Sequence, residues 1–110
     1  MNAMRRSLAV LLAAYALAAF PQTHEVPAEL WDRPRTANAI ALEESVKRAV
    51  AAVLDKPEAQ LVIHHGVGQE PLLQAEELRS WLGALAIDTR RIALRGDLAA
   101  GAPIRIEVIP

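Results

Sequence analysis

Two consecutive histidines, His64 and His65, are the residues whose type is best suited to chemistry in this chain. A neutral imidazole can ligate a metal ion or carry a proton near neutral pH. However, adjacent side chains of a strand point to opposite faces, and no carboxylate stands nearby at ligand spacing. The third histidine, His24, falls in a segment that we expect to be a linker. We therefore expect one histidine in the core, the other at a strand end, and no metal site. A metal-dependent enzyme that uses His64 or His65 is the alternative.

Three further patterns resemble catalytic or ligand-binding motifs only superficially. The run Gly66-Val67-Gly68 precedes an expected helix, where backbone N–H groups can hold an anion, but GxGxxG and Walker motifs are absent from the sequence. Glu43-Glu44 and Glu76-Glu77 are neighbours on expected helices, so their carboxylates do not face each other. The sequence also lacks GxSxG and HExxH. We therefore predict a tight turn, solvated acidic faces, no catalytic residue, no cofactor and no enzymatic activity.

The composition narrows the possible functions. The chain has 110 residues, of which 53% are apolar and 23% charged, with a formal net charge of -1 and no cysteine. The lack of cysteine excludes a disulfide framework, a Cys-ligated zinc site and a thiol nucleophile. The balanced charge argues against nucleic acid as a partner, because such binders carry an excess of basic residues. The length is that of one small domain.

The first residues have the pattern of a secretory signal peptide. Arg5 and Arg6 precede an apolar run over residues 7–20, and Ala16-Leu17-Ala18 fits the small-x-small rule for cleavage. The run is shorter than the roughly 20 residues of a transmembrane span. We therefore predict a signal peptide over residues 1–19 and export to the periplasm, with membrane contact only through an uncleaved leader.

The remaining chain reads as a short linker followed by one domain. Residues 21–38 have no regular pattern and hold Pro21, Pro27 and Pro34 among scattered charges, so we predict a linker over residues 20–27 and a single domain over residues 28–110. The segment Glu29-Leu30-Trp31 could form a short strand or a single turn.

Residues 39–55 give the clearest helical signal. Apolar residues recur there with the 3.6-residue helical period, which predicts one buried stripe. This stripe consists of Leu42, Val46, Ala49, Val50 and Val53. Pro57 should end the helix at or just before Lys56.

The rest of the domain alternates strands with a second helix. We predict a strand over residues 60–65, whose continuous apolar run suits burial on both faces, and a helix that starts at Pro71. The apolar stripe of this helix consists of Leu78, Trp81, Leu82 and Leu85, extended by Ala75. Strands over residues 91–95 and 104–109 should then form a hairpin-like pair. The predicted fold is α+β: a small mixed sheet in the order (β)αβαββ, with two helices packed on one face.

Two residues could contact a partner. Trp31 stands beside Asp32 and Arg33, where it could anchor a partner protein or cap the sheet edge. Arg95 belongs to the C-terminal third, where five arginines stand against three acids. This basic excess could face an acidic partner, although the two signs are interspersed as on ordinary solvated surface.

The run WLGALAIDTRRIALRG over residues 81–96 resembles the closing helix and strand of the OmpA-like peptidoglycan-binding domain family. The run Leu61-Val62-Ile63 before a His-Gly pair looks like its central strand, and Ile104-Arg105-Ile106-Glu107-Val108 looks like its terminal strand. The resemblance covers roughly residues 28–110 and implies an OmpA-like fold in the envelope.

The resemblance also implies where a ligand site would lie. The family holds the diaminopimelate of the cell wall with an Asp after the central strand and an Arg on the second helix, and those positions fall near Gly68 and at Gln74 here. Charge-assisted contacts are the strong part of such a site, so the usual ligand should bind poorly. The groups left near this pocket are His65, Gln74 and Arg79.

These observations predict a non-enzymatic envelope protein that acts as an interaction module for an envelope protein partner. Weak binding of peptidoglycan through His65, Gln74 and Arg79 is the first alternative. The metal-dependent enzyme is the second.

Overall fold

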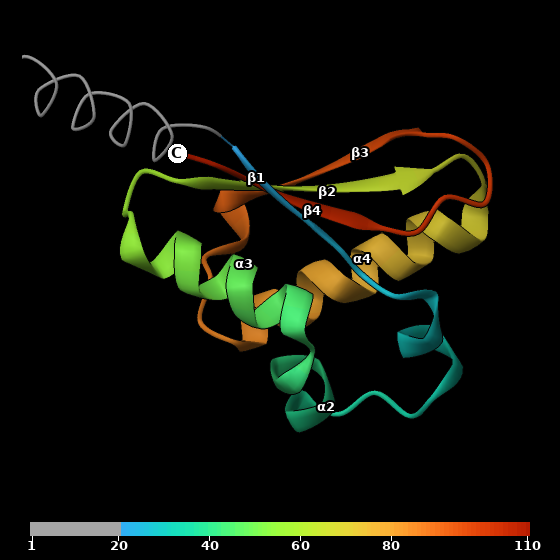
Figure 1. Cartoon of the computed structure of the whole chain (residues 1–110), viewed down its shortest axis with the longest axis horizontal. Coiled ribbons are helices and arrows are strands. Elements are labelled where there is room, and N and C mark those ends of the chain that lie inside the picture. Colours follow the sequence, from blue (N-terminus) through green and yellow to red (C-terminus); the bar gives the residue numbers. More distant parts are fainter. Residues whose placement is uncertain (1–20) are drawn as a thin grey trace, which may run out of the picture.

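The computed structural model describes residues 21–110, so the predicted signal peptide over residues 1–19 lies outside the described part. The described residues form a compact α+β fold around one four-stranded mixed sheet (Figure 1). Its strands are β1 (Gln22–Glu25), β2 (Gln60–Gly66), β3 (Ile92–Leu98) and β4 (Arg105–Ile109).

The strand order in the sheet is β1-β4-β2-β3. β4 is antiparallel to both β1 and β2, while β3 is parallel to β2. The predicted hairpin-like pair of the last two strands is therefore wrong. The helix between β2 and β3 returns the chain so that β3 runs parallel to β2. β4 then takes the central position, which suits its buried Ile106 and Val108.

Helices cover one face of this sheet, as predicted (Figure 1). The α-helices of the described residues are α2 (Ala37–Leu42), α3 (Glu44–Asp55) and α4 (Gln69–Ala84). Two short 3-10 helices, η1 (Ala28–Asp32) and η2 (Thr89–Arg91), precede α2 and β3. No helix within residues 21–110 is long and apolar enough to cross a membrane.

The single helix predicted over residues 39–55 is two helices in the structure. Glu43 has extended backbone angles (φ -64°, ψ 124°) and ends α2 with an N–H that donates to the Ile40 carbonyl. Its own carbonyl accepts from the Lys47 N–H and so starts α3. The stripe of α3 is buried as predicted, but the break turns Leu42 outward, where it is 72% exposed. A periodic apolar pattern does not reveal such a break.

The segment that we expected to be a linker contributes to the sheet. Residues Gln22–Glu25 form the edge strand β1, and the next residue, Val26, is fully buried and donates to the Ile104 carbonyl at 2.8 Å. Residues 29–31 form the single turn, within η1, and this turn buries Leu30. The strand was missed because only one of its four side chains is even partly buried, so it carries no apolar signal.

The core lies between the sheet and the helices. Its largest fully buried side chains include Leu30, Ile40, Leu61, Ile63, Leu78, Leu82 and Ile106. The run 61–63 at the centre of β2 is buried on both faces, as predicted. The second amphipathic stripe is also confirmed, because Ala75, Leu78 and Leu82 of α4 are buried.

Candidate functional site

Trp31, a predicted partner contact, and Gln74, a predicted ligand contact, line one cleft at an end of the sheet. This end cleft, as we call it, has a volume of about 320 Å³ and lies between η1, the first turns of α4 and residues 101–104. Its lining combines the Trp31 ring with apolar groups such as Pro71 and Pro103 and with the polar side chains of Asp32, Glu70 and Gln74. The cleft is therefore an aromatic and apolar hollow with polar groups along its wall.

The charge of the end cleft is negative. Asp32 and Glu70 are exposed acids of its lining, and no basic residue of the described chain lines it. A partly enclosed site that is lined by carboxylates and by no basic residue attracts cations and repels anions. A cationic group, such as a lysine ammonium or an arginine guanidinium, would therefore complement the charge of the cleft.

An ionic pair, Arg35 with Glu77, contacts both the ring and the backbone of Trp31. The Arg35 guanidinium lies 5.4 Å from the centre of the Trp31 ring, and its Nη1 donates to the Trp31 carbonyl at 3.0 Å. Arg35 also donates to both carboxylate oxygens of Glu77, through Nε and, at 3.1 Å, through Nη2. The same carboxylate accepts from the Trp81 indole at 3.3 Å. Hydrogen bonds from Arg35 lower the pKa of Glu77 against the opposing effect of burial. Arg35 has no recognisable pattern in the sequence, because its partner Glu77 is 42 residues away.

The two positions at which the resemblance expects ionic ligands are neutral here. Gly68 directly precedes α4 with φ 116°, a backbone conformation that favours glycine. Gln74 reaches the end cleft from α4 with an uncharged amide. The acids of the cleft come instead from η1 and from the first turn of α4.

The other nominated residues lie apart from the end cleft. His65 is only 7% exposed, and its Nδ1 is 2.9 Å from the Gly66 carbonyl oxygen. Its ring packs on Gly96 so closely that a Cβ there would lie 3.0 Å from Cε1. Arg79 donates to the Thr89 carbonyl at 3.0 Å and so joins α4 to η2. Arg95 is exposed on the edge strand β3. The expectation of one buried histidine is thus confirmed by His65.

His64 lies on the opposite face of β2 and connects three strands. Its Nδ1 is 2.7 Å from Oδ1 of Asp97 on β3, and its Nε2 is 2.9 Å from Oε1 of Glu107 on β4. This position is mid-sheet and not at a strand end. Burial lowers the pKa of His64, but the hydrogen bonds and charges of Glu107 and Asp97 outweigh it and raise the pKa above 6.5. The same contact lowers the pKa of Asp97.

This arrangement favours a protonated imidazole over metal ligation. Each ring nitrogen of His64 already has a carboxylate oxygen, and the two nitrogens of an imidazole point away from each other. The carboxylates therefore do not converge on one ion. No group of three or more side chains suited to a metal ion occurs within residues 21–110.

The raised pKa of His64 predicts a loss of stability as the pH rises. The folded state holds this proton more tightly, so its contribution is complete below pH 6.5 and is lost as the pH passes the raised pKa. His24 acts in the opposite direction, because burial and Arg48 lower its pKa. The measurement is an NMR titration of the His64 ring, with denaturation at each pH, in the wild type and in Glu107→Gln. A His64 pKa that is no higher in the wild type than in Glu107→Gln would contradict this prediction.

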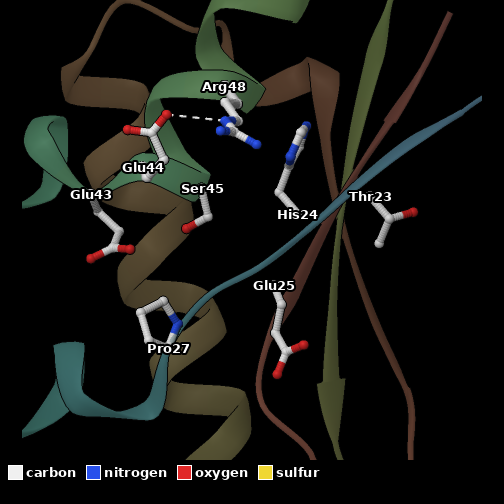
Figure 2. Close-up of a pocket in the computed structure, with 8 residues that line it drawn as sticks. All are labelled: Thr23, His24, Glu25, Pro27, Glu43, Glu44, Ser45 and Arg48. Atoms are coloured by element: carbon white, nitrogen blue, oxygen red, sulfur yellow. Dashed lines mark hydrogen bonds and ion pairs between the residues drawn. The ribbon is translucent and has the colours of Figure 1, made fainter.

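A second cleft lies between β1 and the start of α3 (Figure 2). Nε2 of His24 and Oγ of Ser45 are both buried there without a hydrogen-bond partner, and they are not bonded to each other. Glu44 pairs with Arg48 at 3.0 Å across the rim. A nucleophile and its base are normally joined by a hydrogen bond, and none joins Ser45 to His24 here.

Comparisons of the chain with protein-family models, with curated proteins and with solved structures found no match.

Proposed function

We propose that this chain is an exported, non-enzymatic interaction module of the cell envelope, built on a shortened OmpA-like fold, that binds a partner protein in the end cleft. The order of strands and helices agrees with the (β)αβαββ order that the resemblance implies. The leader-like composition of the first residues supports export to the periplasm.

The observation that carries the proposal is the place of Trp31 in the end cleft, beside the acids Asp32 and Glu70. Interfaces concentrate their binding energy in a few rigid, partly buried residues, and tryptophan and arginine are the commonest of these. The Arg35 guanidinium, paired with Glu77, lies 5.4 Å from the centre of the Trp31 ring and bonds to the Trp31 carbonyl, so it supports this residue before any partner arrives. The acids Asp32 and Glu70 select a basic group of the partner.

Affinity capture from an envelope extract tests this function with matched variants. We expect a partner that the wild type retains, that Trp31→Ala loses by tenfold or more, and that Glu70→Lys also loses because the charge of the cleft is reversed. Leu42→Ala, at an exposed apolar residue on α2, is the control and should retain the partner. A partner retained equally by all four proteins would overturn the end cleft as the binding site.

Weak binding of peptidoglycan is the second candidate. One observation favours it: the carboxylates of Asp32 and Glu70 could pair with the ammonium group of a cell-wall peptide. Of His65, Gln74 and Arg79, the three residues that we predict to bind peptidoglycan, only Gln74 lines the end cleft. Arg35, which lies against the Trp31 ring, is already paired with Glu77. Binding to purified peptidoglycan separates the two candidates. If peptidoglycan retains the wild type and does not retain Glu70→Lys, cell-wall binding is supported.

The metal-dependent enzyme is the third candidate, and it is the least supported. His64 and His65 lie on opposite faces of β2 and each has polar partners of its own. Elemental analysis of the purified protein tests it, because an enzyme of this kind would carry a stoichiometric metal ion.

A further inference from the structure

The strand β3 forms a free edge of the sheet. Among the described residues, its only neighbour is β2, and its other side has no hydrogen-bonded partner strand (Figure 1). With seven residues it is longer than β1, the strand at the opposite edge, which has four. Ala93, Arg95, Gly96 and Asp97 of this strand are exposed. Unpaired backbone groups on such an edge can pair with a strand of another molecule.

The charges of β3 are complementary to the same strand of a second copy. Arg95 and Asp97 stand on either side of Gly96 and have opposite signs. When two copies pair antiparallel around a two-fold axis at Gly96, Arg95 of each copy lies opposite Asp97 of the other. Unlike charges directly opposite each other stabilise a strand pair, and like charges destabilise it.

Other two-fold registers are less favourable. An axis at Arg95 would place two arginines opposite each other, and an axis at Asp97 would do the same with two aspartates. Of these three registers, only the one centred on Gly96 places unlike charges opposite each other. It also places the residue without a side chain at the point where the two copies meet.

The contacts of Asp97 within the chain are compatible with this pairing. His64 uses only Oδ1 of this carboxylate, which has a second oxygen, and the Asp97 side chain is 51% exposed. The β2–β3 register shifts between His64 and Gly66. Because His64 pairs with Arg95 and Gly66 with Leu98, the extra residue of β3 falls at Gly96–Asp97, beside the two-fold axis, so the regular pairing should be short.

We propose that two copies of this protein associate through antiparallel pairing of their β3 strands, in the register that sets Arg95 of each copy opposite Asp97 of the other. The two four-stranded sheets then form one continuous sheet across a two-fold axis. The interface is separate from the end cleft, which each copy keeps open.

Sedimentation equilibrium of the purified protein over about 1–200 µM tests the proposal. The wild type should show a monomer–dimer equilibrium. Arg95→Asp replaces two opposite-charge pairs with two like-charge pairs, so we expect the dissociation constant to rise about tenfold or more. Lys47→Asp reverses the charge of an exposed residue on α3 and serves as the control, with no change in association. Circular dichroism verifies that each variant is folded.

Mixing two variants gives the most specific test. Asp97→Arg alone should also associate more weakly than the wild type. When the Arg95→Asp and Asp97→Arg proteins are mixed, every pair across the axis is again of opposite charge, so a heterodimer should form. If Asp97→Arg fails to fold, Asp97→Asn combined with a salt titration of the wild-type dimer takes its place, and weaker association in both is expected. A wild type that stays monomeric at 200 µM, or an Arg95→Asp protein that dimerises like the wild type, would overturn the proposal.

Discussion

Replacing Arg91 with alanine should lower the free energy of unfolding by about 2–3 kcal/mol. The Arg91 guanidinium donates to three backbone carbonyls: Ala59 at 2.9 Å, Val53 at 3.0 Å and Lys56 at 2.8 Å. Two of these belong to the end of α3, whose last turn contains no basic residue of its own. A cation at a helix C-terminus also interacts favourably with the helix dipole. Arg91 therefore closes α3 and connects it to the start of β3.

Its neighbour provides the matched control. Arg90 has a side chain that is 89% exposed and pairs only with the nearby Asp88. Exposed pairs of this kind contribute little, so Arg90→Ala should leave the unfolding midpoint almost unchanged. Urea denaturation of both variants measures the difference. Equal midpoints for Arg91→Ala and Arg90→Ala would contradict the role of Arg91.

Replacing Ile63 with alanine should have a larger effect, about 3–4 kcal/mol. Ile63 is fully buried in β2, which lies between β4 and β3, and it is one of the largest residues of the core. Removing its side chain loses hydrophobic burial and leaves a cavity that the rigid sheet cannot close. The measurement is again urea denaturation, followed through the tryptophan fluorescence.

A graded series shows whether the loss arises from the cavity. Ile63→Val removes a single methylene group and should cost about 1 kcal/mol. Capture of a partner by the folded fraction should be unaffected, because Ile63 does not line the end cleft. A loss of less than about 1 kcal/mol for Ile63→Ala would mean that this part of the core is loosely packed.

The sequence predicted those parts of the fold that depend on local apolar patterns. The stripes of α3 and α4 and the buried run of β2 all have a strong periodic signal, and each is where we expected it. The strand order was predicted incorrectly, because β3 and β4 are adjacent in sequence and short links usually join neighbouring strands. Which strands are neighbours depends on the packing of the whole sheet.

The candidate site was predicted only in part, for a similar reason. Trp31 and Gln74 were nominated from residue type and from the resemblance, and the structure brings them to one cleft. Arg35 carried no signal, because its role depends on Glu77, which is distant in sequence. The contacts of His64 with Asp97 and Glu107 also join residues more than 30 positions apart. Side-chain pairs of this kind become visible only when the strands are placed side by side.

The antiparallel pairing of β1 with β4 determines where a tag can be attached without blocking the end cleft. Gln22 lies opposite Val108, so the start of the described chain and Pro110 are at the same end of the sheet, whereas the end cleft is formed by η1, α4 and residues 101–104 at the other end (Figure 1). A fluorescent reporter or a surface-immobilisation tag attached after Pro110 would therefore project away from Trp31. Such a fusion would present the binding surface to solution with its approach unobstructed.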